Sequence, residues 1–246
     1  MDKTLRILDI NIHNLSYVEV LEKVEEFIRS GQSHIMVCAN PEMVLYARRK
    51  PEYRDFINRA DLVTPDGVGL LLAARVLGHP LKERVTGTDL SESFGRLSAE
   101  KGYSMYFLGG EPGIAEEAAS SLANRYPGVN IVGIHHGFFS SDDEKEIVAD
   151  IKNKKPDILM VCLGMYIQEM WIQKYFRELN VPVCLGNGGA LDFVAGKRRR
   201  APKWLMGLGL EWLFRLIQDP SWARIKRQMT LPLFVFKVLL QKAGFR

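Results

Sequence analysis

Short apolar runs alternate with longer amphipathic stretches along most of this chain. Apolar runs of strand length lie at residues 33–39, 61–64, 103–108, 130–134, 157–163 and 181–185, and a segment of alternating apolar and polar residues lies at 5–11. The stretches between them predict helices at residues 17–29, 68–77 and 166–179, and two helices that begin at Pro41 and Pro51. Four more helices are predicted to end at about residues 101, 126, 155 and 194. Strands that are apolar throughout and separated by helices are typical of a parallel sheet covered on both faces. We therefore expect an α/β fold with a mostly parallel sheet and helices on both faces.

The pattern changes after residue 195, where short basic helices replace the alternation of strands and helices. These helices are expected at residues 208–218, 221–229 and 233–242, with Trp and Phe side chains among Lys and Arg. Residues 196–246 carry 12 of the 33 Lys/Arg and two of the 29 acidic residues, which leaves 21 Lys/Arg and 27 acidic residues for the remainder. We therefore divide the chain into an α/β domain at residues 1–195 and a basic C-terminal helical appendage at residues 196–246.

The composition of the appendage suits contact with an anionic membrane surface. Apolar helix faces enter the acyl boundary of a bilayer, while cations meet anionic head groups. The apolar run at residues 231–240 is too short to span a bilayer, which takes about 20 residues. An ordinary helical cap over the sheet is the alternative, and the apolar faces also suit burial in a homo-oligomer. No nucleic-acid partner is expected, because the aromatics are not arranged as a stacking platform.

The N-terminus lacks the basic and apolar regions of a signal peptide, so we expect a cytoplasmic protein that is peripheral on the inner face of the cell membrane. Cys38, Cys162 and Cys184 lie in apolar runs without metal-ligand spacing, and we interpret them as buried thiols. His135 and His136 are adjacent, so on a strand they face opposite sides and do not jointly bind one ion. No metal site and no cofactor is expected.

The segment around Asp66 is the first candidate for chemistry. An apolar run ends at Pro65, and Asp66 and Gly67 precede a run with helical period. Asp66 is therefore expected at the carboxyl end of a strand, the edge where open α/β sheets bind ligands. A carboxylate at this place serves as a general base, as a metal ligand or as a cap of the following helix.

Other predicted strands end in polar or glycine-rich turns at the same edge. These ends are Asn40, Gly109-Gly110, His136-Gly137, Gly164 and the turn that contains Asn187 and Gly188. Glycine turns before helices hold phosphate oxygens through backbone N–H groups, so we expect a nucleotide-type ligand. A nucleotide-cofactor oxidoreductase is a rival, but its G-x-G-x-x-G fingerprint is absent from the sequence. Arg84 is a candidate cation for a diphosphate, or otherwise a surface ion-pairing residue.

Several motifs together resemble the WecG/TagA/CpsF glycosyltransferase family, in order and over nearly the whole chain. They are Asn40-Pro41-Glu42, Thr64-Pro65-Asp66-Gly67, Glu83-Arg84-Val85-Thr86-Gly87, Gly164, Gln168-Glu169 with Trp171, Gly186-Asn187-Gly188-Gly189, and Arg200-Ala201-Pro202 through Gly209-Leu210-Glu211-Trp212. The resemblance implies a Rossmann-like core and transfer of a sugar from a UDP-sugar donor to an undecaprenyl-diphosphate-linked acceptor. The chain is most similar to the wall teichoic acid branch, which moves N-acetylmannosamine (ManNAc) from UDP-ManNAc onto lipid-linked N-acetylglucosamine (GlcNAc) with inversion. Another donor, such as UDP-ManNAcA or UDP-glucose, is the alternative within the family.

The resemblance also assigns roles to residues. Asp66 stands where the family places its catalytic base, and Arg84 and Gln168 match polar pocket residues beside Asn40. Arg215, Arg224 and Arg227 match arginines that close over the donor diphosphate when the appendage docks. The other expected binding residues are Gly109, Gly110, His136, Gly137, Asn187, Gly188 and Asp192. Cys38 stands where the family pattern has a threonine, which puts a polar role for this position in doubt. Outside the family, a non-catalytic membrane-associated scaffold is a second rival.

Overall fold

The central element is a six-stranded sheet. The computed structural model describes residues 4–202, 204–205, 211–218 and 230–245. The strand order is β4-β3-β8-β7-β5-β6, and every pair of neighbours is parallel. The strands are β3 (His34–Ala39), β4 (Leu62–Pro65), β5 (Ser104–Gly109), β6 (Asn130–His135), β7 (Ile158–Cys162) and β8 (Val183–Gly186). The predicted parallel sheet is confirmed, and all six carboxyl ends lie at one edge.

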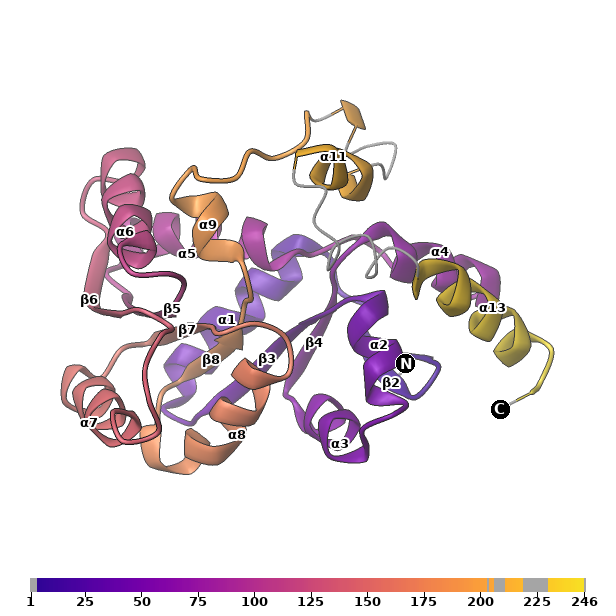
Figure 1. Ribbon diagram of the computed structural model, residues 1–246, viewed down its shortest axis with the longest axis horizontal. Helices are drawn as coiled ribbons and strands as arrows, with labels where there is room; N and C mark the ends of the chain where they lie inside the picture. Colours follow the sequence, from indigo (N-terminus) through magenta and orange to yellow (C-terminus); the bar gives the residue numbers. More distant parts are fainter. Residues whose placement is uncertain (1–3, 203, 206–210, 219–229, 246) are drawn as a thin grey trace.

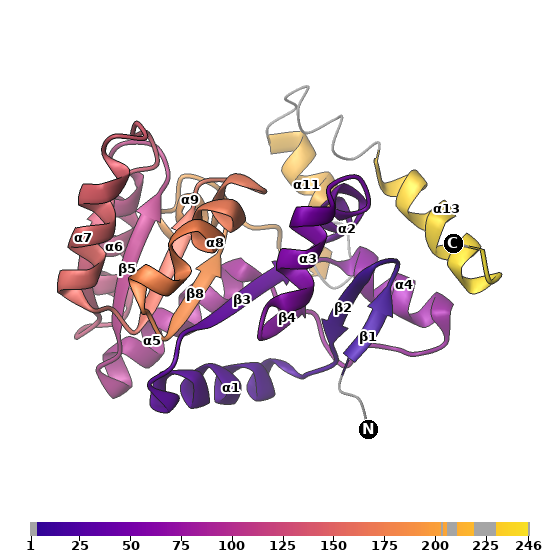
Figure 2. The same ribbon diagram turned by 90° about the horizontal axis from the view of Figure 1, so that it is seen from below.

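Helices cover both faces of this sheet, as predicted (Figures 1 and 2). One face packs against α1 (Tyr17–Ser30), α5 (Gly87–Lys101), α6 (Ile114–Arg125) and α9 (Ala190–Val194). The other packs against α2 (Pro41–Ala47), α3 (Pro51–Arg59), α7 (Glu144–Lys154) and α8 (Ile167–Leu179). Successive strand residues point to opposite faces, so Met36 and Cys38 enter one core and Val37 and Ala39 the other. Burial on both faces explains why these strands are apolar throughout.

The N-terminal segment differs from the single strand expected at residues 5–11. It forms an antiparallel hairpin of β1 (Thr4–Ile7) and β2 (Ile10–His13). The prediction was wrong because the chain reverses at Leu8, which has a φ of 52°, and Asn58 Nδ2 fixes the turn by donating to the Asp9 carbonyl at 2.8 Å. The hairpin lies beside β4, where His13 Nδ1 accepts a hydrogen bond from Val63 N at 3.0 Å.

The sequence explains locally why β3 and β4, two strands that end beside the cavity described below, stop where they do. Asn40 caps α2, because its side chain accepts a hydrogen bond from Met43 N and Pro41 occupies the first helical position. Pro65 is the last residue of β4, which is an edge strand of the six-stranded sheet. Its missing N–H therefore costs no hydrogen bond between strands of this sheet. Gly67 follows with a φ of 99°, a conformation that favours glycine, and α4 (Val68–Leu77) begins directly after it.

The described part of the appendage contains α11 (Glu211–Gln218) and α13 (Thr230–Lys242); the helix expected at 221–229 lies outside the described residues. α13 lies along α4 and α2 and buries Phe234 and Val238 against them. Gln241 ties its far end to the hairpin, because it accepts a hydrogen bond from Leu8 N at 2.7 Å and donates to the Arg6 carbonyl at 3.0 Å. Within the described residues, no helix has both the length and the apolar character that crossing a bilayer requires.

Candidate active site

A cavity of about 740 Å³ opens at the carboxyl edge of the sheet. The residues at the ends of four adjacent strands line it: Asp66 after β4, Asn40 after β3, Asn187 after β8 and Gly164 near the end of β7. Helices α2, α4 and α13 and the first residue of α11 complete its wall. Strand order thus collects side chains that are up to about 150 positions apart in the sequence, as expected for a ligand site of an open α/β sheet.

Asp66 is held at this edge by backbone contacts. Its N–H donates to the Ala39 carbonyl at 2.7 Å, and its Oδ2 accepts a hydrogen bond from Gly87 N at 3.3 Å. Gly87 is the first residue of α5, so the carboxylate lies at the positive end of that helix dipole. Asp66 is not the N-cap of the following helix, which was one of the three roles open to it, because the N-cap of α4 is Gly67. Asp66 therefore presents a half-buried carboxylate to the cavity.

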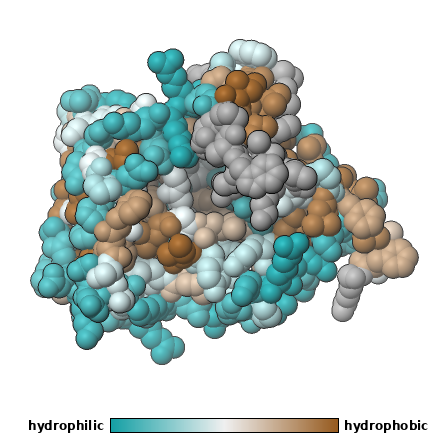
Figure 3. Space-filling model, viewed as in Figure 1, coloured by the Kyte–Doolittle hydropathy of each residue, from teal (hydrophilic) through white to brown (hydrophobic). Residues whose placement is uncertain are grey.

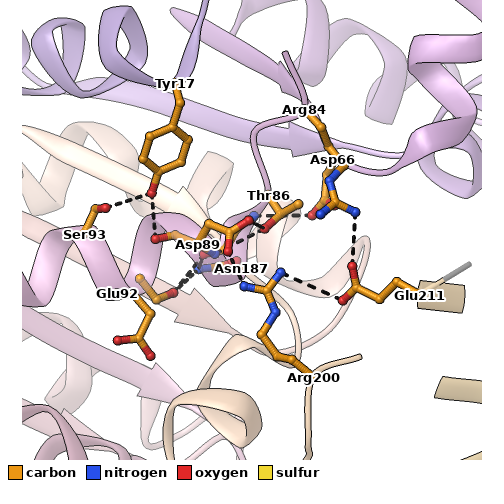
Figure 4. A network of polar contacts seen from close by, with 12 residues as sticks. Tyr17, Asp66, Arg84, Thr86, Asp89, Glu92, Ser93, Asn187, Arg200 and Glu211 are labelled. Carbon is orange, nitrogen blue, oxygen red and sulfur yellow. Dashed lines mark hydrogen bonds and ion pairs between the residues drawn. The ribbon is translucent and has the colours of Figure 1, made fainter. Parts of the chain in front are cut away.

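A network of charged side chains links the appendage to the site (Figure 4). Glu211 of α11 is 7% exposed and pairs with Arg84 at 3.1 Å and with Arg200 at 3.9 Å. Arg200 also pairs with Asp89 of α5, whose Oδ2 accepts a hydrogen bond from the Thr86 hydroxyl. Burial opposes ionisation of Asp89, but Arg200 and Thr86 hold its pKa below the usual range. One appendage carboxylate thus joins two arginines beside the cavity.

A second polar cluster fixes Gln168 in the wall of the cavity. Its Oε1 accepts a hydrogen bond from Gly188 N at 2.8 Å, and its Nε2 donates to Glu169 Oε1 at 2.7 Å. Glu169 is 1% exposed, and its Oε2 accepts a hydrogen bond from Tyr166 N at 2.6 Å. Burial raises the pKa of Glu169. Tyr166 has a φ of 75°, an uncommon conformation for a non-glycine residue, and its bond to Glu169 supports this turn.

Asn187 connects β8 to α5 rather than pointing freely into the cavity. Its Nδ2 donates to the Gly87 carbonyl at 2.9 Å and to the Ser91 hydroxyl at 2.8 Å. A Cβ atom at Gly87 would lie 1.8 Å from Asn187 Oδ1, so this close packing requires glycine. The contact fixes the N-terminus of α5, and with it the Gly87 N–H group that donates a hydrogen bond to Asp66.

Comparison with known proteins decides the class of this site. A family model described as "Glycosyl transferase WecG/TagA/CpsF family" matches residues 5–246. The chain belongs to this family. A curated relative from Staphylococcus aureus (strain MW2), named N-acetylglucosaminyldiphosphoundecaprenol N-acetyl-beta-D-mannosaminyltransferase, is 32% identical over 238 residues. The alignment covers 96% of this chain and 92% of the relative. Proteins of the same name from strains NCTC 8325 / PS 47 and COL match with the same identity and coverage. The predicted family and enzyme class, a glycosyltransferase, are confirmed.

In this glycosyltransferase the cavity brings together one group of the expected site residues, namely Asn40, Asp66, Arg84, Gln168, Asn187 and Gly188. Arg215 lies on α11, whereas Arg224 and Arg227 lie outside the described residues. Asp192 lies on α9 and is not among the residues that line the cavity.

A second group lies away from the cavity, at the ends of β5 and β6. This group is Gly109, Gly110, His136 and Gly137. Their backbone groups bond to each other and to β7: Gly137 N donates to the Gly110 carbonyl at 2.8 Å, and Gly110 N to the Cys162 carbonyl at 3.2 Å. These two N–H groups are therefore satisfied by hydrogen bonds within the fold. β5 and β6 are the last two strands in the sheet order, at the other end from β4.

Five polar residues in the described part of the cavity wall were not expected there: Glu42, Thr88, Arg198, Glu211 and Thr230. Glu42 and Glu211 stand within the motifs that carry the family resemblance, which is the one signal that could have found them. Cys38 also lines the cavity, and its sulfur accepts a hydrogen bond from the Thr64 hydroxyl at 3.4 Å. Burial raises the pKa of the Cys38 thiol well above its usual range, which favours the neutral thiol over the thiolate.

Proposed function

We propose that this protein transfers N-acetylmannosamine from UDP-ManNAc to the GlcNAc of an undecaprenyl-diphosphate-linked acceptor, with inversion at the anomeric carbon. The names of the Staphylococcus relatives support the transferred sugar and the acceptor. The cavity supports it because one carboxylate and several cationic or amide side chains face a space large enough for a nucleotide sugar. Another UDP-sugar donor, such as UDP-ManNAcA or UDP-glucose, is the alternative within the family.

The observation that carries the mechanism is the carboxylate of Asp66 in the cavity wall. In an inverting transfer, a base removes the proton of the acceptor hydroxyl while its oxygen attacks the anomeric carbon and the bond to UDP breaks. Asp66 is assigned this role, and general-base catalysis of this kind contributes about 10²–10⁴-fold. The bond from Gly87 N to Oδ2 orients the carboxylate.

Cations are assigned to the departing diphosphate. Arg84 and Arg198 line the cavity, and the family pattern adds Arg215, Arg224 and Arg227 of the appendage. One well-placed donor to a developing negative charge contributes about 3 kcal/mol to catalysis. Because Glu211 joins Arg84 to the appendage, docking of the appendage and orientation of Arg84 are parts of the same arrangement. Completion of the site by the appendage would also exclude water and limit hydrolysis of the donor.

The appendage is also assigned the contact with an anionic membrane, on the cytoplasmic face. Large apolar side chains are exposed on it: Trp204 at 67%, Ile217 of α11 at 72%, and Phe236 of α13 at 58%. Figure 3 shows apolar surface over α11 and over the side of the molecule where α13 lies. Exposed apolar area combined with the basic charge of residues 196–246 supports binding to anionic lipid. A homo-oligomer that buries the same faces is the alternative, and co-sedimentation with anionic vesicles at a defined oligomeric state separates the two.

The decisive experiment replaces Asp66 by Asn and measures sugar transfer from a panel of UDP-sugars to a GlcNAc-diphosphate-lipid. Asn keeps the size of the side chain and an oxygen that accepts the bond from Gly87 N, so folding and UDP binding should persist. We expect turnover with UDP-ManNAc to fall by about 10²–10⁴-fold. The matched control is Asp142→Asn, an exposed carboxylate in the loop before α7, which should retain wild-type turnover.

Near-wild-type turnover of the Asp66→Asn variant would remove this residue as the base. A wild-type protein that turns over none of the UDP-sugars would instead favour the scaffold, and binding of a reduced nicotinamide cofactor in a fluorescence titration would favour an oxidoreductase.

A further inference from the structure

The cavity does not end at the polar residues of the sheet edge. It continues between α4 and α13, where two rows of aliphatic side chains line it. One row is Val68, Leu72 and Val76 on α4, and the other is Leu231, Val235 and Leu239 on α13. Residues four apart share one face of a helix, so each row is a continuous apolar stripe that leads away from the sheet. Two such stripes with a cavity between them form a groove, which we call the α4–α13 groove.

The groove starts at the catalytic carboxylate. Val68, the first residue of the α4 stripe, follows Asp66 by two positions, and the same cavity contains both. Each stripe covers eight steps along its helix, which corresponds to about 12 Å at 1.5 Å per residue. The polar and apolar parts of the cavity are therefore continuous, and one extended molecule reaches both.

The groove walls remain partly exposed. Leu72 is 51% exposed, Val235 54% and Leu239 50%, although Phe234 and Val238 on the same helix are buried against α4 and α2. Large aliphatic side chains that stay accessible beside a cavity are suited to contact with an apolar ligand.

We propose that the α4–α13 groove binds the first isoprene units of the lipid that carries the acceptor, on the side of its diphosphate. This inference rests on the proposed function. The acceptor sugar must lie at Asp66, and its diphosphate is covalently attached to it, so the hydrocarbon chain has to leave the cavity close to the reacting atoms. Around the sheet edge the wall carries Arg84, Arg198, Glu42 and Glu211, which would be desolvated by a hydrocarbon chain. The α4–α13 groove is an apolar part of this wall, and neither of its two stripes contains a charged side chain.

The α4–α13 groove also leads toward the surface of the appendage to which membrane contact was assigned above. Phe236 and Leu233 are exposed on α13 and do not line the cavity, so they lie on the outside of the helix whose inner stripe forms the groove. A lipid in the groove would leave the bilayer beside these residues and bring its diphosphate to the cations of the site. The groove would thus position the acceptor, whereas the outer surface of α13 would hold the protein at the membrane.

The test compares two acceptors, GlcNAc-diphosphate attached to a long polyprenyl chain and the same group attached to a short alkyl chain. The readout is the ratio of the two kcat/KM values, with UDP-ManNAc as the donor. Leu72→Glu places a charge in the groove, and Leu72→Trp fills it with an apolar side chain; the half-exposed position should tolerate both. The control is Phe236→Glu, an apolar residue of similar exposure on the outside of α13.

We expect the wild-type protein to favour the long chain, and we expect both Leu72 variants to lower the ratio by about tenfold or more. Phe236→Glu should weaken binding to anionic vesicles but leave the ratio within about twofold of wild type. A ratio that stays at the wild-type value in both Leu72 variants overturns the groove as the lipid site. An equal fall in Phe236→Glu also overturns it, because membrane anchoring alone would then explain the preference. A wild-type protein that glycosylates neither acceptor refutes the proposed function itself, which separates the two failures.

Discussion

The ion pair between Arg84 and Glu211 offers a quantitative test of how the appendage is joined to the core. The side chains lie 3.1 Å apart and are 20% and 9% exposed. At an effective dielectric constant of about 20, unit charges at this distance attract by about 5 kcal/mol, and desolvation offsets part of this. We expect a net coupling of about 2–3 kcal/mol, within the range measured for close charge pairs at interfaces.

A double-mutant cycle measures this coupling. Arg84→Ala, Glu211→Ala and the double variant are unfolded in urea, and the coupling is the departure of the double variant from additivity. The matched control is Lys197–Glu117, which also joins residues 196–246 to the α/β domain but is 51% and 48% exposed. Exposed pairs contribute about 0.2–1 kcal/mol, so the control cycle should give a coupling within that range. Glu211→Ala alone should lower Tm by about 4–12 °C, at about 2–4 °C per kcal/mol for a chain of this size.

A coupling below about 0.5 kcal/mol for Arg84 and Glu211 would refute this reasoning, because that is the scatter of independent sites. Desolvation of the two side chains would then cancel their attraction, and the pair would contribute no measurable net stability. If the coupling is as large as expected, Glu211→Ala should also raise KM for the UDP-sugar donor, because Arg84 loses the partner that fixes its position.

Two further predictions concern residues that support the site. Glu169→Gln offers one acceptor oxygen to two donors, Gln168 Nε2 and Tyr166 N, so it should destabilise the protein by about 1–3 kcal/mol at a pH below the ordinary glutamate range. Because burial raises the pKa of Glu169, its contribution to stability is present at low pH and is lost as the pH rises from the ordinary glutamate range through the raised value. Urea unfolding across this interval should show a flatter pH dependence in the variant, and an unchanged slope would contradict the assignment. Gly109→Ala should lower the unfolding free energy by at least about 3 kcal/mol, because its Cβ would lie 2.3 Å from the Cys162 carbonyl oxygen at a φ of 135°. Gly128→Ala, with a φ of 93° but its nearest atom at 3.9 Å, should cost only about 1–2 kcal/mol, and equal losses would show that space at Gly109 is not the cause.

The helices and strands of the α/β domain were predictable because their signals are local. Apolar runs gave the six parallel strands to within about two residues, and Asn40-Pro41 marked the start of α2 through a cap and a favourable first position. The hairpin at the N-terminus was missed because one alternating segment is compatible with one strand or two. Its turn at Leu8 is stabilised by Asn58, a contact across 49 positions that no local pattern contains.

The sequence by itself determined that polar and glycine-rich turns follow the strands, that Asp66 ends one of them and that the C-terminal residues are basic. Which of these turns share a cavity depends on strand order, and strand order results from packing between distant segments rather than from local periodicity. The order β4-β3-β8-β7-β5-β6 brings Asp66, Asn40 and Asn187 together and leaves Gly109 and His136 at the other side. Tertiary structure likewise decided that Glu211 meets Arg84 and that α13 lies against α4, because both contacts join segments separated by more than 100 residues.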